Sequence, residues 1–288
     1  MRAIIPAFTL ALALTGCVTG TPATDIDDDT TDTASAALVQ GEMIIYEAGQ
    51  PIPQSELVDL GPPGALGGTV LEGDPAISAR VDHASGPFLA GVFQATRGKV
   101  LIHFPFTEHA TILAGEVALT DATGHHAVLR PGDSYLIHQG SDIVWDVTGD
   151  LVQKSFFNRV EPADSPSPMR SYANGSLTAD TDLVDLGPPG SLGGTVLEGN
   201  PAISARVDYA QDGLLAGVFQ ATRGTVLIDF PFTEHATITR GKVRLTDEAG
   251  NTRVLKPGDA YLIAQDSQIH WDVPVDFVQE SFFNYAAP

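Results

Sequence analysis

Residues 106–121 have the sequence FTEHATILAGEVALTD, and a second version of it, FTEHATITRGKVRLTD, occupies residues 232–247. Ala114, Glu116 and Ala118 are replaced in the second version by Arg240, Lys242 and Arg244. They alternate with positions that stay the same, which are Gly115, Val117 and Leu119. A period of two is typical of a β-strand, because successive side chains point to opposite faces. We therefore expect the unchanged positions to face a core and their neighbours to face water.

The repeat extends well beyond this stretch. Residues 57–158 and 183–284 align without a gap, and about three-quarters of the aligned positions are identical. A period of this length indicates two whole domains rather than a solenoid of short repeats. The sequence predicts a first domain over residues 43–160, a linker over 161–168 and a second domain over 169–288.

Each unit consists of short apolar runs separated by Gly, Pro and Asp, for example residues 77–82, 89–94, 134–137 and 152–157. Short strands at regular spacing, with turn residues between them, are typical of an all-β sandwich or barrel. No segment of ten residues with a helical period occurs in either unit. The predicted fold class is therefore all-β, with two tandem barrels.

The motifs of each unit resemble those of the cupin superfamily. The resemblance rests on residues 106–121, on LRPGDSYLI at 129–137, on VWDV at 144–147 and on VQKSFF at 152–157. The branch that the chain resembles is the ureidoglycine-aminohydrolase and ethanolamine-utilisation type of cupin domain. The resemblance implies a double-stranded β-helix, or jelly roll, in each unit, and thus a bicupin.

By the same resemblance, cupin enzymes hold a divalent metal with an HxH pair, a Glu and a later His. Imidazole and carboxylate ligands suit transition metals. Placing Glu at its family position leaves two of the four ligands in each copy, which are His103 and Glu108 in the first and Asp229 and Glu234 in the second. A tight site needs at least three protein ligands. We therefore expect no cofactor, with a divalent transition metal as the alternative if further ligands converge.

One histidine is shared by the two copies, and it follows a shared glutamate. These candidate catalytic pairs are Glu108 with His109 and Glu234 with His235. Neighbouring residues on a strand face opposite ways unless a bulge intervenes. A bulge would aim both side chains inward as metal ligands or as an acid–base pair. Without one, one side chain faces the barrel and the other is a hydrogen-bonded surface or interface residue.

Other polar residues recur at matching positions and are candidate ligand-binding residues at the barrel mouths, where Arg would offer a planar fork to a small anionic or polar ligand. Structural ion pairs are the alternative for the same side chains. The charge of Lys154 is reversed in Glu280, so these two cannot carry one shared role. The six candidates are Glu72, Arg80, Gln94, Glu198, Arg206 and Gln220.

Composition excludes some function classes. The formal net charge of −21 argues against a nucleic-acid partner, because phosphate binding relies on Lys and Arg. The single cysteine, Cys17, excludes an intramolecular disulfide and a CxxC-type zinc site.

The amino terminus is typical of a targeting segment. The apolar run at residues 3–14 would rise about 18 Å as a helix, too short for a hydrocarbon core of about 30 Å. It ends in Leu-Thr-Gly-Cys17, which resembles the bacterial lipobox. We expect residues 1–16 to be a signal peptide and Cys17 to be lipidated, with residues 17–42 as an Asp- and Thr-rich tether. This places the protein in the bacterial cell envelope, on the outer membrane or facing the periplasm.

Three functions remain open from the sequence. The first is a non-catalytic lipoprotein that binds a small ligand. The second is a metal-dependent aminohydrolase or isomerase that uses His103, Glu108 and His109. The third is a structural envelope protein whose barrels serve to form a homo-oligomer.

Overall fold

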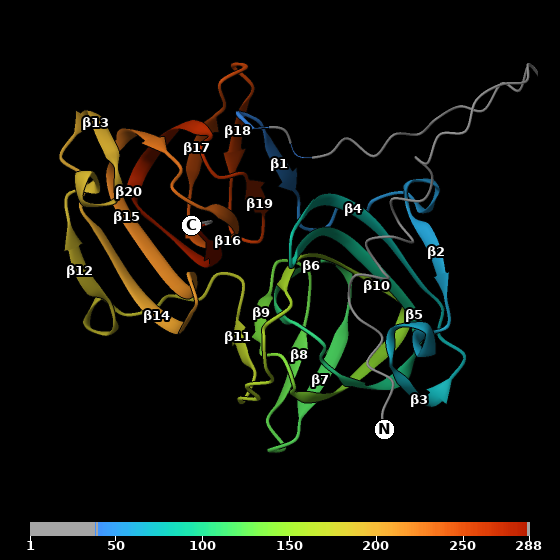
Figure 1. Ribbon diagram of the computed structural model, residues 1–288. Coiled ribbons are helices and arrows are strands. Elements are labelled where there is room, and N and C mark those ends of the chain that lie inside the picture. Colours follow the sequence, from blue (N-terminus) through green and yellow to red (C-terminus); the bar gives the residue numbers. More distant parts are fainter. Residues whose placement is uncertain (1–37, 39, 287–288) are drawn as a thin grey trace, which may run out of the picture.

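The computed structural model describes residues 38 and 40–286, so the expected signal peptide and Cys17 lie outside the described residues. Strands dominate this part of the chain and form two separate ten-stranded sheets (Figure 1). The regular helical segments there are short 3-10 turns: η1 (Gln54–Glu56), η2 (Pro63–Leu66), η3 (Asp180–Asp182) and η4 (Pro189–Leu192). The predicted all-β fold with two tandem barrels is confirmed.

The two sheets have the same strand order. The first contains β2 (Val58–Gly61), β3 (Thr69–Gly73), β4 (Ile77–Ser85), β5 (Phe88–His103), β6 (Thr107–Gly115), β7 (Val117–Asp121), β8 (His126–Leu129), β9 (Ser134–Ile137), β10 (Asp142–Arg159) and β11 (Arg170–Tyr172). The second contains β1 (Met43–Tyr46), β12 (Val184–Gly187), β13 (Gly194–Gly199), β14 (Ile203–Gln211), β15 (Leu214–Asp229), β16 (Thr233–Gly241), β17 (Val243–Thr246), β18 (Thr252–Leu255), β19 (Ala260–Ile263) and β20 (Gln268–Tyr285).

The barrels exchange their leading strands. The first strand of the chain, β1, pairs antiparallel with β19 of the second barrel, from Met43 opposite Ile263 to Tyr46 opposite Ala260. The strand that leads into the second unit, β11, pairs with β9 of the first barrel. Figure 1 shows β1 beside β19 and β11 beside β9. The expected domain bounds group each leading strand with the unit that follows it in sequence, whereas in the structure that strand completes the sheet of the other barrel.

The alternation expected around residues 115–119 holds at two of its three core positions. Val117 and Leu119 are fully buried in the first barrel. Gly115 is exposed and has φ +75° at the junction of β6 and β7. A Cβ there would lie 2.0 Å from the Leu151 carbonyl oxygen, so this position is glycine for backbone reasons.

Three apolar cores follow from the period-two pattern. One fills the first barrel, one fills the second, and a third lies between the barrels and combines residues of both, such as Leu113, Phe157 and Phe283. Strands β6 and β10 serve two cores at once, because alternate side chains point inward and toward the other barrel. These two strands position the candidate site.

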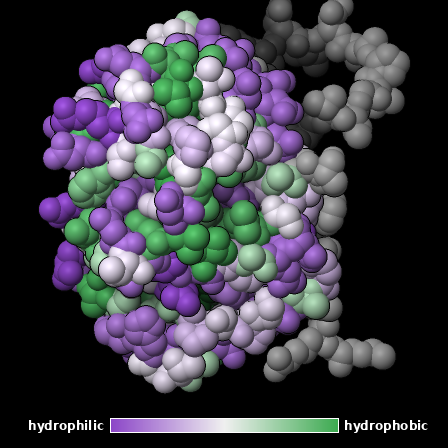
Figure 2. Space-filling model, turned by 90° about the vertical axis from the view of Figure 1, so that its left-hand side faces the viewer, coloured by the Kyte–Doolittle hydropathy of each residue, from purple (hydrophilic) through white to green (hydrophobic). Residues whose placement is uncertain are grey.

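Some apolar side chains remain exposed on the second barrel. Val184, Leu192, Val196 and Leu197 are each more than 40% exposed, on β12, η4 and β13. Figure 2 looks onto this side of the molecule and shows apolar residues gathered across it. Within the described residues, no helix is long and apolar enough to span a membrane.

Candidate functional site

A buried ion pair occupies the interior of the first barrel. Glu108 on β6 and Lys154 on β10 both point inward, on the same faces as Ile112 and Phe156. They are only 2% and 5% exposed. The Lys154 ammonium donates to Glu108 Oε1, and it also donates to Tyr135 Oη at 2.7 Å. Tyr135 in turn donates its hydroxyl hydrogen to Glu108 Oε1 at 2.7 Å.

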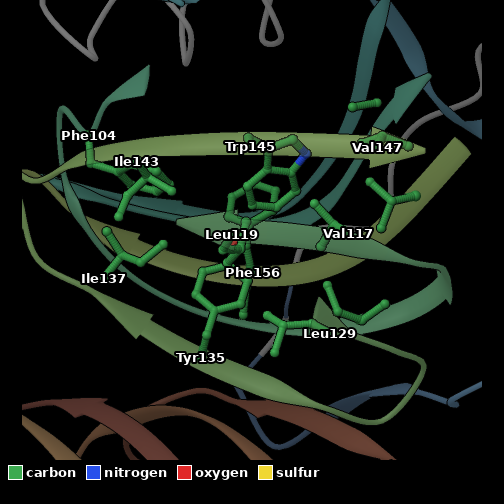
Figure 3. Close-up of a cluster of buried hydrophobic side chains, with 14 of the residues drawn as sticks. Phe104, Val117, Leu119, Leu129, Tyr135, Ile137, Ile143, Trp145, Val147 and Phe156 are labelled. Atoms are coloured by element: carbon green, nitrogen blue, oxygen red, sulfur yellow. The ribbon is translucent and has the colours of Figure 1, made fainter. Parts of the chain in front are cut away.

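Aromatic rings surround this ion pair. The Lys154 Nζ atom lies 5.2 Å from the ring centroid of Phe93, 5.4 Å from Tyr135, 5.1 Å from Trp145 and 6.0 Å from Phe156. Figure 3 shows Tyr135, Trp145 and Phe156 turned toward the middle of the barrel. Such distances permit cation–π attraction. Burial lowers the pKa of Lys154, and the neighbouring Glu108 charge opposes that shift without cancelling it.

The second barrel has the same interior glutamate and tyrosine as the first, but a glutamate replaces the lysine. Glu234 corresponds to Glu108 and Tyr261 to Tyr135, but Glu280 stands where the first barrel has Lys154. The Tyr261 hydroxyl lies 2.7 Å from Glu234 Oε1 and 3.2 Å from Glu280 Oε1. Asn284 donates to Glu234 Oε2 at 3.1 Å. Among the described residues, the interior of this barrel therefore holds two carboxyl groups and no side-chain cation.

The pKa values of these carboxyl groups reflect their burial. Desolvation raises the pKa of Glu234 to about 7, although hydrogen bonds from Tyr261 and Asn284 lower it. Desolvation, together with the nearby Glu234 charge, raises the pKa of Glu280 well above its usual range. At neutral pH the pair therefore retains protons that a solvated pair would lose.

His109 and His235 lie between the barrels and not inside them. Their Nδ1 atoms are 2.9 Å apart, and both side chains are fully buried. Each ring also contacts a serine of the opposite barrel through Nε2 at 3.0 Å, Ser281 for His109 and Ser155 for His235. The simple strand alternation therefore applies: the glutamate faces the barrel interior, and the histidine is an interface residue.

The contact between the two Nδ1 atoms restricts the tautomers of this histidine pair. One Nδ1 must donate and the other must accept, so the two neutral rings adopt opposite tautomers. Burial lowers the pKa of His235 to about 3. Burial, with the neighbouring His235 as a second cause, lowers the pKa of His109 well below its usual value. Both rings are therefore neutral at pH 7.

The candidate metal ligands do not come together. His103 lies at the end of β5, where its side chain is 55% exposed and its Nδ1 atom contacts Asp142 Oδ1 at 2.8 Å. Asp229 is exposed and accepts a hydrogen bond from Gln268 at 2.8 Å. Across residues 38 and 40–286, no group of three or more His, Cys, Asp or Glu side chains is arranged to hold a metal ion.

The two candidate arginines already have partners. Arg80 Nε contacts Asp82 Oδ1 at 2.8 Å and also reaches Glu56, and Arg206 Nε contacts Asp208 Oδ1 at 2.9 Å. These contacts are the structural ion pairs that the sequence left as the alternative.

The remaining ligand-binding candidates also have ordinary contacts. Gln94 and Gln220 each accept a hydrogen bond from a buried glutamine of the neighbouring strand. Glu72 is exposed beside Lys99 at 3.0 Å. Glu198 lines an open surface hollow of about 400 Å³, and Gln220 lines another of about 380 Å³. The six candidates therefore do not form one site at a barrel mouth.

Sequence reasoning missed the central role of Lys154 and Glu280. Their charge reversal argues against a shared role, yet both side chains lie at matching positions inside the barrels. Their spacing along the strand could have revealed this position. Lys154 lies two residues from Val152 and from Phe156, which share the inward face of β10, so its side chain points inward as well. A charged residue on an inward-facing position needs a partner inside the barrel.

Comparison with known proteins supports the architecture. The model of the EutQ-like cupin domain family matches residues 83–156 and 210–280. A protein of unknown function from Pseudomonas syringae pv. tomato str. DC3000 has a similar solved structure, with a TM-score of 0.64 and 18% identity over 84% of this chain and 98% of that chain. A cupin 2 conserved barrel domain protein from Leptotrichia buccalis gives a TM-score of 0.51 and 9% identity, over 88% of this chain and 100% of that chain. At such identities the likeness concerns the fold alone. No curated protein matches the chain.

Proposed function

The chain belongs to the EutQ-like cupin domain family, and on this premise we propose that it is an envelope-anchored bicupin lipoprotein that works as a non-catalytic ligand-binding or structural module. The observation that carries the proposal is the ion pair between Lys154 and Glu108. Glu108 is the residue that the family resemblance would assign to a metal, and here its charge is neutralised by a lysine of the same barrel.

The second barrel supports the same function. Its two interior carboxyl groups lack a histidine partner, since His235 points away into the inter-barrel contact. These two carboxyl groups and the Tyr261 phenol include no imidazole, the ligand that suits Zn, Fe and Ni, and within residues 38 and 40–286 no three His, Cys, Asp or Glu side chains are arranged to hold a metal ion.

A thermal-unfolding experiment with divalent ions tests the non-catalytic function. The full chain is unfolded with and without Mn²⁺, Fe²⁺, Ni²⁺ or Zn²⁺, next to the variants Glu108→Gln and Glu234→Gln. We expect no stabilisation that depends on either glutamate, because a ligand raises the midpoint only when it binds the folded state. Stabilisation that a variant abolishes would favour a metal-dependent aminohydrolase or isomerase instead.

The anchor is a separate part of the proposal and has its own test. Acyl chains contribute about 0.8 kcal/mol per buried methylene, so two or more chains hold a protein at a membrane without a spanning helix. The sequence features that support the anchor are the apolar run at residues 3–14 and Cys17 after Leu-Thr-Gly. Cell fractionation should find the wild-type chain with the membranes and the Cys17→Ser variant in the soluble fraction. Equal membrane association of both chains would contradict lipidation.

A further inference from the structure

We propose that the interior of the second barrel binds a small ammonium-type cation, either ammonium itself or a short primary alkylammonium, between Glu234 and Glu280. This inference rests on the proposed binding function and names its ligand class. The two barrels have the same interior glutamate, tyrosine and aromatic rings. They differ where Lys154 supplies a positive charge in the first and Glu280 stands in the second.

The interior of the first barrel surrounds a primary ammonium group. There a primary ammonium, Lys154 Nζ, donates to a carboxylate and a phenol inside four aromatic rings. The corresponding rings of the second barrel are Tyr261, Trp271 and Phe282, which belong to its interior cluster, and Phe219, which packs against that cluster. The Tyr–Trp contact is closely conserved, with ring centroids 6.1 Å apart at 73° in the first barrel and 5.9 Å apart at 78° in the second.

The Tyr261 hydroxyl is the donor shared by the two carboxyl groups of the second barrel, and the Trp271 indole N–H is buried there without making a hydrogen bond. Burial raises the pKa of Tyr261 well above its usual value, so the phenol keeps its single hydrogen. That hydrogen serves one of the two carboxyl groups within reach, Glu234 or Glu280, and not both. Glu280 Oε2 is buried without a hydrogen-bond partner. In the first barrel the Lys154 ammonium provides the corresponding donors.

An ammonium group fits these requirements better than a metal ion or a shared proton. An ammonium carries three or four N–H donors, enough for both carboxylates and the Tyr261 oxygen, whereas a shared proton supplies a single donor. The aromatic rings add cation–π attraction, which suits an organic or ammonium cation. Because Glu280 is only 2% exposed, the occupant must be small.

Thermal unfolding of the full chain in different chloride salts tests this inference. The salts are ammonium, methylammonium, sodium and tetramethylammonium chloride at equal ionic strength. The pH is 8, above the pKa of about 7 of Glu234. We expect ammonium and methylammonium to raise the midpoint over sodium by about 3 °C or more, which corresponds to ligand well above its Kd. Tetramethylammonium, which has no N–H donor and is larger, should behave like sodium.

The matched control is Glu280→Lys, which copies the first barrel and supplies its own ammonium. This variant should lose the difference between ammonium and sodium. An equal response of wild type and variant, or no difference between the salts in the wild type, would overturn the inference.

A second measurement keeps the inference testable if Glu280→Lys does not fold. In Trp145→Phe, Trp271 is the remaining tryptophan, so its fluorescence reports on the second barrel. Ammonium chloride should change this signal saturably and sodium chloride should not; identical titrations would contradict the inference. Different results would contradict the proposed function and this inference. A glutamate-dependent response to Mn²⁺, Fe²⁺, Ni²⁺ or Zn²⁺ would contradict the proposed function. The absence of an ammonium response would contradict this inference alone.

Discussion

At the level of single residues, adjacent side chains of a strand face opposite sides of the sheet and therefore have different surroundings. Glu108 points into the first barrel, whereas His109, the next residue, contacts His235 at the centre of the inter-barrel core. The sequence identified both residues and the alternation that separates them. It could not show that the histidine faces a second barrel, because that depends on how two whole sheets pack together.

The buried histidines predict a pH dependence of stability. Their folded pKa values lie below the usual value of 6.5, so below that pH the unfolded chain binds protons that the folded chain does not. Stability therefore falls as the pH falls from about 6.5, by about 1.4 kcal/mol per pH unit for each histidine. Urea unfolding of His109→Gln between pH 6 and pH 4 should show a slope reduced by about this amount.

The control for this experiment is His126→Thr, which changes an exposed histidine to the residue that the second copy has at this position. Its pH slope should match that of the wild type. If His109→Gln also keeps the wild-type slope, the histidine pair does not determine the acid sensitivity.

The ion pair of the first barrel predicts strong coupling between its members. Lys154→Met leaves the Glu108 carboxylate buried without its cation, and breaking a buried pair in this way costs about 3–5 kcal/mol. Adding Glu108→Gln removes the stranded charge, so the double variant should be more stable than Lys154→Met alone. Urea unfolding of the wild type, both single variants and the double variant measures this coupling. Purely additive losses would show that the two side chains do not interact.

At the scale of elements, strands and their faces were predictable and the exchange of strands was not. The apolar runs and turn residues locate most strands within each unit, because period-two patterning is a local property. The partner of β1 is not local. The two copies have nearly the same sequence, so β9 and β19 offer β1 almost identical edges. Which barrel it joins depends on chain connectivity and on the packing of the whole molecule.

Removal of β1 should loosen one barrel selectively. A chain that starts at residue 48 lacks the partner of Ala260–Ile263, so amide hydrogen exchange in β19 should become faster. The equivalent strand of the first barrel, Ser134–Ile137, keeps its partner β11 and serves as the internal control. Unchanged protection in β19, or loss of protection in β9 instead, would contradict the exchanged pairing.

At the scale of the whole molecule, two barrels of one design have different interiors. The first is neutralised by its own lysine, and the second contains two carboxyl groups. The repeat, the barrels and Glu108 with Glu234 could all be predicted from the sequence. The polar clusters could not, because they bring together side chains from β6, β9 and β10, which are distant along the chain.

The acidic interior predicts an opposite pH dependence for the second barrel. The pKa values of Glu234 and Glu280 are raised in the folded state, so stability is lost as the pH rises from the unfolded value of about 4.5 through about 7. Glu280→Lys removes one acid and gives the other a partner. Its free energy of unfolding relative to wild type should therefore rise between pH 5 and pH 8, by about 1.4 kcal/mol per pH unit. Urea unfolding at both pH values in sodium chloride measures the difference, and a difference that does not change with pH would contradict it.

We propose that these barrels work without the transition metal that a cupin enzyme would hold. The metal content of the full chain as purified, after growth with Mn, Fe, Ni and Zn supplied, tests this proposal. We expect far less than one bound ion of any of these metals per chain, with the same value in Glu108→Gln and Glu234→Gln. One tightly bound ion per chain, lost in either variant, would contradict it.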